Sequence, residues 1–325
     1  MNYRLIDFPV YHPVEKYQDA INRAVEIISK EKGVSGIYNF GKIRNPGISD
    51  ADILVVFADG QLCNLNLLSE LKGNERYYFM HTQLGMPESL LKQVYNYQLH
   101  ISLDLIYGKP VDFTLPSISQ EDKTKLEKQI ALEYLVNACL KNYRISYEGV
   151  IKVRGLLLEA YAIRHDLRLL GITSGKLFDL VEEIAEWRQN WFDSTPSNTQ
   201  IIKWFNEYST ELEAFLRQIF LIESFFLATG KMVMRFKDTQ ITSAETFSIK
   251  PLCIPGVVYR SLPLLAQKVI RKKINMYHVK FPVANADESS LLNKRIKFLR
   301  ECVAYNQKHL PYFYPFNTVL EILLQ

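Results

Sequence analysis

The sequence predicts an α+β protein in three parts: a domain of mixed helices and strands over residues 1–118, a helical domain over residues 119–230, and a basic, mostly helical region over residues 231–325. Short apolar runs separated by turn residues fill the first part, whereas long segments with helical spacing follow the connector GKPVDFTLPSISQ. With 325 residues, 48% hydrophobic and 23% charged, the chain has an ordinary globular composition and the length for two or three domains.

The first domain is expected to begin with a helix over residues 14–32. Apolar residues recur there every three or four positions from Tyr17 to Ile28, and Gly33 ends the segment. The elements expected next are, in order, strands at VSGIYNF and ILVVF, a helix around residues 65–71, a strand at RYYFMH, a helix starting at Pro87, and a strand at HISLDLIYG. This mixture predicts a sheet with flanking helices.

The second part of the chain is expected to be helical. Its predicted helices cover residues 119–145, 147–170, 175–193 and 199–229, with breaks at Gly171, Gly175 and the run FDSTPSNT. Beyond Gly230 the helical spacing is lost, and MVMRFKD and ETFSIKPL could pair as strands before further helices.

Composition excludes several classes of protein. The four cysteines show no CxxC spacing, the six histidines form no HExxH or HxxxH pair, and the N-terminus lacks the pattern of a signal peptide, so we expect a reduced, cytoplasmic protein without a structural zinc site. The most apolar helical stretch, FLRQIFLIESFFLATG, is too short and too charged to span a bilayer. The net charge of +4 is mild and selects no partner by itself.

Two aspartates stand at the head of an apolar strand in the stretch NFGKIRNPGISDADILVVF. Because side chains alternate along a strand, Asp50 and Asp52 project from one face, and Asp104 projects from one face of a later strand. Clustered carboxylates repel one another, and a divalent cation such as Mg²⁺ removes that conflict. The alternative is that Asp50 caps a turn, Asp52 lies on an edge strand and Asp104 pairs with a Lys or Arg.

The region of residues 34–108 resembles the nucleotidyltransferase superfamily related to DNA polymerase β. The resemblance rests on Phe40-Gly41, the entry SDADILVVF, and Asp104 in SLDLI. It implies a mixed sheet with flanking helices, in which Asp50 and Asp52 ligate two Mg²⁺ (or Mn²⁺) ions. Asp104 would hold the second ion and help to deprotonate an acceptor hydroxyl, which attacks the α-phosphate of an NTP and expels pyrophosphate.

The same resemblance implies a nucleotide site formed by Gly41, Lys42 and Ser49. The family positions the triphosphate with a Gly-Ser or Gly-Gly turn, but this chain has Lys42 at the second position and a shorter loop. Lys42 could instead act as a point charge on a phosphate, and Ser49 is better suited to tightening the turn than to touching substrate. The acceptor hydroxyl that the resemblance implies could belong to a small molecule, a protein or an RNA end.

A second hypothesis is a nucleotidyltransferase fold that has lost catalysis and recruits RNA or a protein partner. Residues 268–300 hold nine Lys or Arg against one Asp and one Glu, and the following LPYFYPF could offer rings for stacking. A solvated helix face and packed aromatic residues would explain the same patterns.

Overall fold

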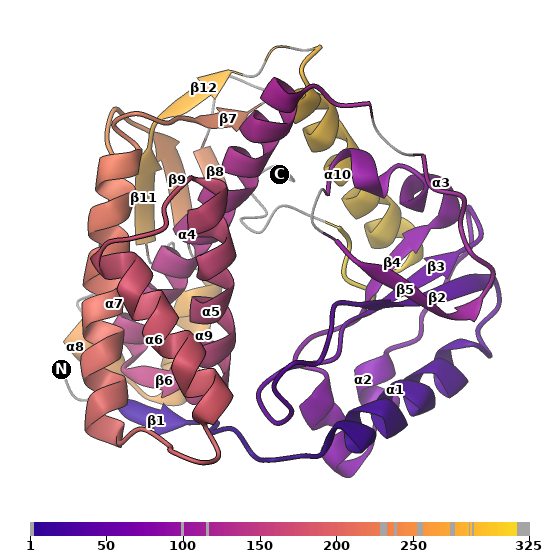
Figure 1. Cartoon of the computed structure of the whole chain (residues 1–325), viewed down its shortest axis with the longest axis horizontal. Coiled ribbons are helices and arrows are strands. Elements are labelled where there is room, and N and C mark those ends of the chain that lie inside the picture. Colours follow the sequence, from indigo (N-terminus) through magenta and orange to yellow (C-terminus); the bar gives the residue numbers. More distant parts are fainter. Residues whose placement is uncertain are drawn as a thin grey trace. The chain divides into compact units, whose positions relative to one another are not determined.

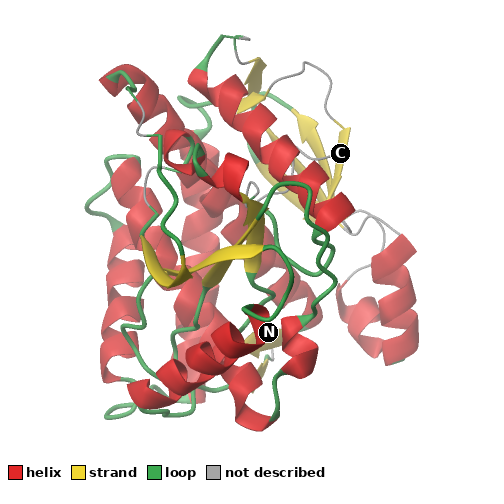
Figure 2. Cartoon of the chain, turned by 90° about the vertical axis from the view of Figure 1, so that its right-hand side faces the viewer, coloured by secondary structure: helices red, strands yellow, loops and turns green. Residues whose placement is uncertain are grey.

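A computed structural model describes residues 3–98, 101–114, 117–227, 233–236, 239–251, 256–273, 277–285, 287 and 289–316. The chain divides into two compact units. The sheet unit consists of residues 10–123 and 294–317, and the helical unit contains the described residues of 1–9 and 124–293. Both contain helices and strands, which confirms the α+β class (Figures 1 and 2).

The sheet unit is built on a four-stranded mixed sheet in the order β4-β3-β2-β5. Its strands are β2 (Val34–Phe40), β3 (Ile53–Phe57), β4 (Leu84–Pro87) and β5 (Leu103–Gly108). Strand β2 is antiparallel to both β3 and β5, and β3 is parallel to β4. All five residues of β3 are buried, as expected for an inner strand with both faces covered.

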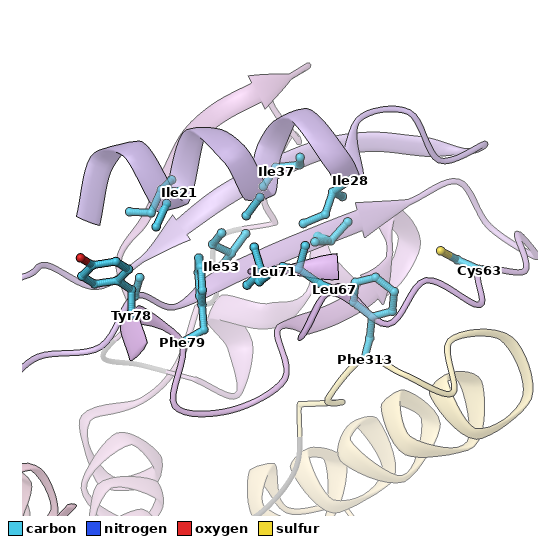
Figure 3. Close-up of a cluster of buried hydrophobic side chains, with 14 of the residues drawn as sticks. Ile21, Ile28, Ile37, Ile53, Cys63, Leu67, Leu71, Tyr78, Phe79 and Phe313 are labelled. Atoms are coloured by element: carbon cyan, nitrogen blue, oxygen red, sulfur yellow. The ribbon is translucent and has the colours of Figure 1, made fainter. Parts of the chain in front are cut away.

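One face of this sheet is covered by α1 (Val14–Ile28), whose apolar stripe is the one predicted from the sequence. Figure 3 shows Ile21 and Ile28 of this helix packed over Ile37 and Ile53 of the sheet. We call this cluster the α1-side core; α2 (Leu67–Glu70) and the 3₁₀ helix η1 (Gly73–Tyr78) add further residues to it.

The opposite face is covered by α3 (Glu88–Leu91), the short 3₁₀ helix η2 (Val94–Asn96) and α10 (Leu291–His309). Phe298, Leu299 and Cys302 of α10 pack on Leu54 and Val56 of β3. We call this cluster the α10-side core. The helix that completes the sheet unit therefore comes from the C-terminal part of the chain, which differs from the predicted division at residues 118 and 230.

The segment after α10 continues the sheet beyond β4. The amide of Tyr314 donates to the carbonyl of Gln83 at 2.8 Å, and the amide of Gly85 donates to the carbonyl of Tyr314 at 3.0 Å. A Cβ on Gly85 would lie 2.6 Å from the Cβ of Phe313, so only glycine fits at this position. The buried Asn306 amide donates to the carbonyls of both Gly85 and Phe313.

One of the strands predicted in the sheet unit is wrong, and another is observed. RYYFMH is not a strand: its first half lies in η1, where Tyr78 enters the α1-side core while the backbone forms tight turns. The strand at this place is β4, whose residues LGMP show no alternating pattern. The strand predicted at HISLDLIYG is observed as β5, and its first residue, His100, lies outside the described residues.

The helical unit contains α4 (Gln120–Glu148), α5 (Val153–Leu169), α6 (Lys176–Asn190) and α7 (Asn198–Ile219), close to the predicted helices (Figure 1). The fourth helix was predicted to run to residue 229, but α7 ends at Ile219. Phe220 leaves the helix and stacks on Phe247 and Phe281, so packing with distant aromatic rings ends it. Strand β1 (Arg4–Ile6) pairs in parallel with β6 (Val150–Lys152).

A second sheet lies in the helical unit, in the order β10-β11-β9-β8. Its strands are β8 (Val233–Phe236), β9 (Thr239–Ser243), β10 (Ser248–Pro251) and β11 (Tyr277–Phe281). The strands predicted at MVMRFKD and ETFSIKPL are β8 and β10, but β9 and β11 separate them. The remaining elements are β7 (Phe225–Leu227), paired with β12 (Val283–Asn285), and the helices α8 (Gly256–Ser261) and α9 (Leu264–Lys273).

Among the described residues, every helix falls short of the length and apolar character that crossing a membrane requires.

Candidate metal centre

The first part of the loop between β2 and β3, residues 41–49, is held in place by two tyrosines. The amide of Gly47 donates to the hydroxyl of Tyr17 at 2.9 Å, and that hydroxyl donates to the carbonyl of Ser49 at 2.8 Å. The hydroxyl of Tyr77 donates to the carbonyl of Gly47 at 2.6 Å. Tyr17 belongs to α1 and Tyr77 to η1, so the two elements that form the α1-side core also fix the loop before Asp50.

Ser49 closes the turn at the end of this loop. Its hydroxyl accepts a hydrogen bond from the amide of Asn45 at 3.1 Å, its own amide donates to the carbonyl of Asn45 at 2.8 Å, and it is 5% exposed. This geometry matches the expectation that Ser49 tightens the turn, and it leaves the Ser49 hydroxyl facing backbone.

Gly41 and Lys42, the other two residues of the predicted nucleotide site, are the first two residues of the loop. Gly41 has a φ of 96°, which favours glycine, and no atom lies within 4 Å of the position that a Cβ would take. Lys42 and Arg44 are exposed, while Ile43 between them packs against the α1-side core. Two cationic side chains therefore leave the loop on its solvent side, shortly before the aspartates.

Asp50, Asp52 and His81 form a cluster that could hold a metal ion, which we call the Asp-Asp-His cluster. One carboxylate oxygen of each aspartate and one ring nitrogen of His81 all lie within 4.8 Å of one another. Nε2 of His81 is 2.9 Å from Oδ1 of Asp52 and 4.0 Å from Oδ2 of Asp50. Asp52 is fixed by the sheet, because its carbonyl accepts from the amide of Phe40 at 2.9 Å.

The ring of His81 is oriented by its own backbone neighbourhood. Nδ1 lies 2.8 Å from the carbonyl of Thr82, which can only accept, so Nδ1 has the proton of this hydrogen bond and Nε2 faces the carboxylates. An Nδ1–H donated to a backbone carbonyl is the arrangement that orients metal-binding histidines through Nε2.

The charge state of the cluster follows from the same contacts. The polar contact with Asp52 raises the pKa of His81 to about 9, against the opposing effect of partial burial. Oδ1 of Asp52 is itself screened from solvent and receives no well-directed hydrogen bond from the described residues. With its pKa raised, the His81 ring is protonated at neutral pH and faces this oxygen, so a bound metal ion would displace the proton on Nε2.

Asp104 lies on the other face of the sheet from Asp52. Phe40 pairs with Asp52 on one side and with Leu103 on the other, and these residues face the α10-side core. Asn39 pairs with Ile53 and with Asp104, and Ile53 faces the α1-side core. Strand β2 also lies between the strands of the two acids. Asp52 and Asp104 are therefore separated across the sheet by two strand spacings, about 9 to 10 Å. The structure thus brings Asp50 and Asp52 together and leaves Asp104, which was predicted to be the third acid, apart from them.

The basic C-terminal stretch is only partly described. Lys294, Lys297 and Arg300 are exposed along one side of α10, whereas Arg295 is buried. The side chains of Lys268 and of residues 271–273 lie outside the described residues. In LPYFYPF, Leu310, Phe313 and Phe316 belong to the cores of the sheet unit, and Tyr312 and Tyr314 are exposed. The proposed RNA contact through residues 268–300 stays a prediction.

His81 is the residue of the cluster that the sequence did not reveal. It lies far from Asp52 along the chain, and it is brought near only because β4 pairs in parallel with β3. The sequence placed His81 at the end of the strand predicted at RYYFMH, whereas it lies in the bend before β4. A histidine just before a strand that follows the DxD strand would have been the signal to look for.

Comparison of the chain with known proteins finds no matching family model, no similar curated protein and no similar solved structure.

Proposed function

We propose that this protein is a metal-dependent nucleotidyltransferase that uses the Asp-Asp-His cluster to bind its cation. The observation that supports this most directly is the convergence of two carboxylates and an oriented imidazole at the head of β3, next to a glycine loop with two exposed cations. The mixed sheet with an antiparallel β2–β3 pair and a DxD entry to β3 is compatible with the nucleotidyltransferase resemblance of residues 34–108.

Asp50, Asp52 and His81 would hold Mg²⁺ or Mn²⁺ between them. A bound divalent ion supplies charge neutralisation for the phosphates of an NTP and polarises the phosphorus that is attacked. Because imidazole is a more usual ligand of transition metals than of Mg²⁺, we expect Mn²⁺ to bind more tightly than Mg²⁺.

The remaining residues of the site would bind and orient the nucleotide. Lys42 and Arg44 would contact the β- and γ-phosphates as cations, and Gly41 would let the backbone approach them closely. An acceptor hydroxyl then attacks the α-phosphorus, the bond from that phosphorus to pyrophosphate breaks, and the hydroxyl proton leaves to solvent. Asp104 has no part in this version of the site, which differs from the three-acid arrangement that the resemblance implies.

Metal binding is the first test. Titration of the full chain with Mn²⁺, followed by the electron paramagnetic resonance signal of the free ion, should show saturable binding. Asp52→Asn and His81→Ala should each weaken it about tenfold or more, the scale on which even outer-shell partners act. Asp104→Asn is the matched control and should bind like the wild type. Equal weakening by Asp104→Asn would restore Asp104 to the metal site, and unchanged binding by Asp52→Asn would refute the cluster.

Transfer is the second test. The protein is incubated with each labelled NTP and Mn²⁺ or Mg²⁺, and pyrophosphate release and self-labelling are measured. Release that disappears in Asp52→Asn and falls in Lys42→Ala would support the proposal. The alternative, a binding protein without catalysis, is favoured by the separation of Asp104 from the cluster. It predicts Mn²⁺ binding with no pyrophosphate release from any nucleotide.

A further inference from the structure

The aromatic residues of the segment after α10 differ in their burial. Phe313 and Phe316 are 5% and 6% exposed and belong to the α1-side and α10-side cores. Tyr314, between them, is 44% exposed. Core packing accounts for the two phenylalanines but not for the exposed ring of Tyr314.

The backbone of Tyr314 is held on both sides. Its amide donates to the carbonyl of Gln83 at 2.8 Å, and its carbonyl accepts from the amide of Gly85 at 3.0 Å. A tyrosine ring has only two side-chain torsions, so a ring on a fixed backbone loses little conformational freedom when a ligand covers it. Tyr314 is therefore a preorganised aromatic surface.

This ring lies next to the Asp-Asp-His cluster. The ring centres of Tyr314 and His81 are 6.5 Å apart, with 46° between the ring planes. Leu84 pairs in parallel with Leu54 and with Tyr314, so these three side chains leave the same face of the sheet. Asp52, two residues before Leu54, is on that face too. The segment of Tyr314 is two strand spacings, about 9 to 10 Å, from β3.

The cationic loop lies on the other side of the cluster. Lys42 and Arg44 follow β2, which pairs with the edge of β3 opposite to β4, whereas Tyr314 pairs with the far edge of β4. The cluster at the head of β3 is thus between two exposed cations and one exposed ring. A nucleotide has the same division, with its phosphates at one end and its base at the other.

We propose that Tyr314 is the residue on which the base of the bound nucleotide stacks, and that the site therefore prefers purine to pyrimidine nucleoside triphosphates. With the β- and γ-phosphates at Lys42 and Arg44 and the metal ion at the cluster, the nucleoside extends toward Tyr314. Every base has a face that can stack on an aromatic ring, and the two fused rings of a purine cover more of it. This inference rests on the proposed function, because it takes the position of the phosphates from it.

Calorimetric titration of the full chain with Mn²⁺ tests this role. The probes are an ATP analogue with a methylene bridge between the α- and β-phosphorus, which cannot release pyrophosphate, and inorganic triphosphate, which has no base. Tyr314→Ala should raise the dissociation constant of the analogue about tenfold, the scale of one base stacked on one ring. It should leave the affinities for inorganic triphosphate and for Mn²⁺ unchanged.

Two further variants serve as controls. Tyr314→Phe keeps the ring and should bind both probes like the wild type. Tyr312→Ala removes the neighbouring exposed ring, which is 46% exposed, and should have no effect on either probe.

Fluorescence and base preference supply readouts on the wild type itself. The triphosphate of 2-aminopurine riboside should lose fluorescence on binding, because its base stacks on the ring, and the corresponding UTP analogue should bind more weakly than the ATP analogue. Equal affinity for the ATP and UTP analogues would overturn the stacking role. So would wild-type affinity for the ATP analogue in Tyr314→Ala, or an equal loss of affinity for inorganic triphosphate in that variant.

The failure of the stacking role is distinguishable from the failure of the proposed function. If the wild type binds both probes and Tyr314→Ala binds them equally well, only the stacking role is refuted. If the wild type binds neither probe in the presence of Mn²⁺, the proposed function is refuted, and the stacking role with it.

Discussion

At the scale of single residues, Asp166 shows what burial does to a carboxyl group. It lies on α5 and is 4% exposed. Burial alone raises its pKa to about 8, since the described residues supply neither a cation nor a hydrogen bond to oppose the effect. A carboxyl in this state is neutral at acidic pH and is forced to ionise in the core of the helical unit as the pH rises.

Asp166 should therefore make the stability of the helical unit depend on pH. The pKa of Asp166 is higher in the folded state than in the unfolded state. The stabilisation that comes from its protonated carboxyl is therefore fully present below the unfolded-state pKa near 4 and is lost as the pH rises to about 8. Asp166→Asn removes this dependence. The free energy of unfolding of the variant should exceed that of the wild type by an amount that grows with pH, at most about 1.4 kcal/mol per pH unit, and reaches a few kcal/mol at pH 8.

The measurement is urea denaturation followed by tryptophan fluorescence between pH 4 and 9. All three tryptophans, Trp187, Trp191 and Trp204, belong to the helical unit, so the signal reports that unit alone. Asp193→Asn, at an exposed position, is the control and should leave the pH profile unchanged. A difference between Asp166→Asn and the wild type that stays constant over this range would contradict the burial of an unpaired carboxyl.

Single residues were predicted well where the cause is local. The alternation of one strand is sufficient to place Asp50 and Asp52 together, because both lie in the same short segment. The positions of His81 and Asp104 depend on which strands are neighbours and on which face each strand turns to the core. A one-residue change in register moves a side chain to the other face, so the sequence could not decide whether Asp104 joins the pair.

At the scale of elements, α1 has two roles that its sequence pattern does not separate. The periodic apolar stripe predicted the helix and its buried face, and the structure agrees. Tyr17, counted there as apolar, also holds the loop before Asp50 through its hydroxyl. Periodicity records that a residue is buried, but it does not record what its polar atom bonds to.

Tyr17→Phe should separate these roles. It keeps the ring in the core but leaves the amide of Gly47 and one bond of the Ser49 carbonyl unsatisfied, at a cost of about 1 to 3 kcal/mol. We expect lower stability of the sheet unit, measured by amide exchange in β2 and β3, and weaker Mn²⁺ binding because the loop that positions Asp50 is released. Tyr312→Phe, at an exposed position, should change neither quantity. Wild-type Mn²⁺ affinity in Tyr17→Phe would show that the loop does not depend on this tyrosine.

At the scale of the whole molecule, residues 294–317 belong to the same sheet unit as residues 10–123. The three-part division was inferred from changes of composition along the sequence, and the change near residue 118 lies close to the boundary at residue 123. The packing of α10 on the sheet was not predictable, because its apolar face fits any apolar surface of similar width. Nothing local in LLNKRIKFLRECVAYNQKH identifies which surface that is.

The dependence of the sheet unit on α10 is open to a direct test. A fragment of residues 10–123 exposes Leu54, Val56 and Met86 and should be insoluble or lack dispersed nuclear magnetic resonance signals. Joining residues 290–317 to it through a flexible linker should restore a folded sheet unit. Changing Phe298 and Leu299 to Asp in the linked fragment is the control and should abolish the rescue. A folded 10–123 fragment would show that α10 is dispensable.

The segment after α10 gives the sheet two unlike ends. On the β4 side, Tyr314 and its neighbours already occupy the backbone groups through which a further strand would add. On the β5 side the described part of the chain adds no further strand. The C-terminal segment therefore blocks the addition of a further strand at the β4 edge, through residues that lie more than two hundred positions from β4 in the sequence.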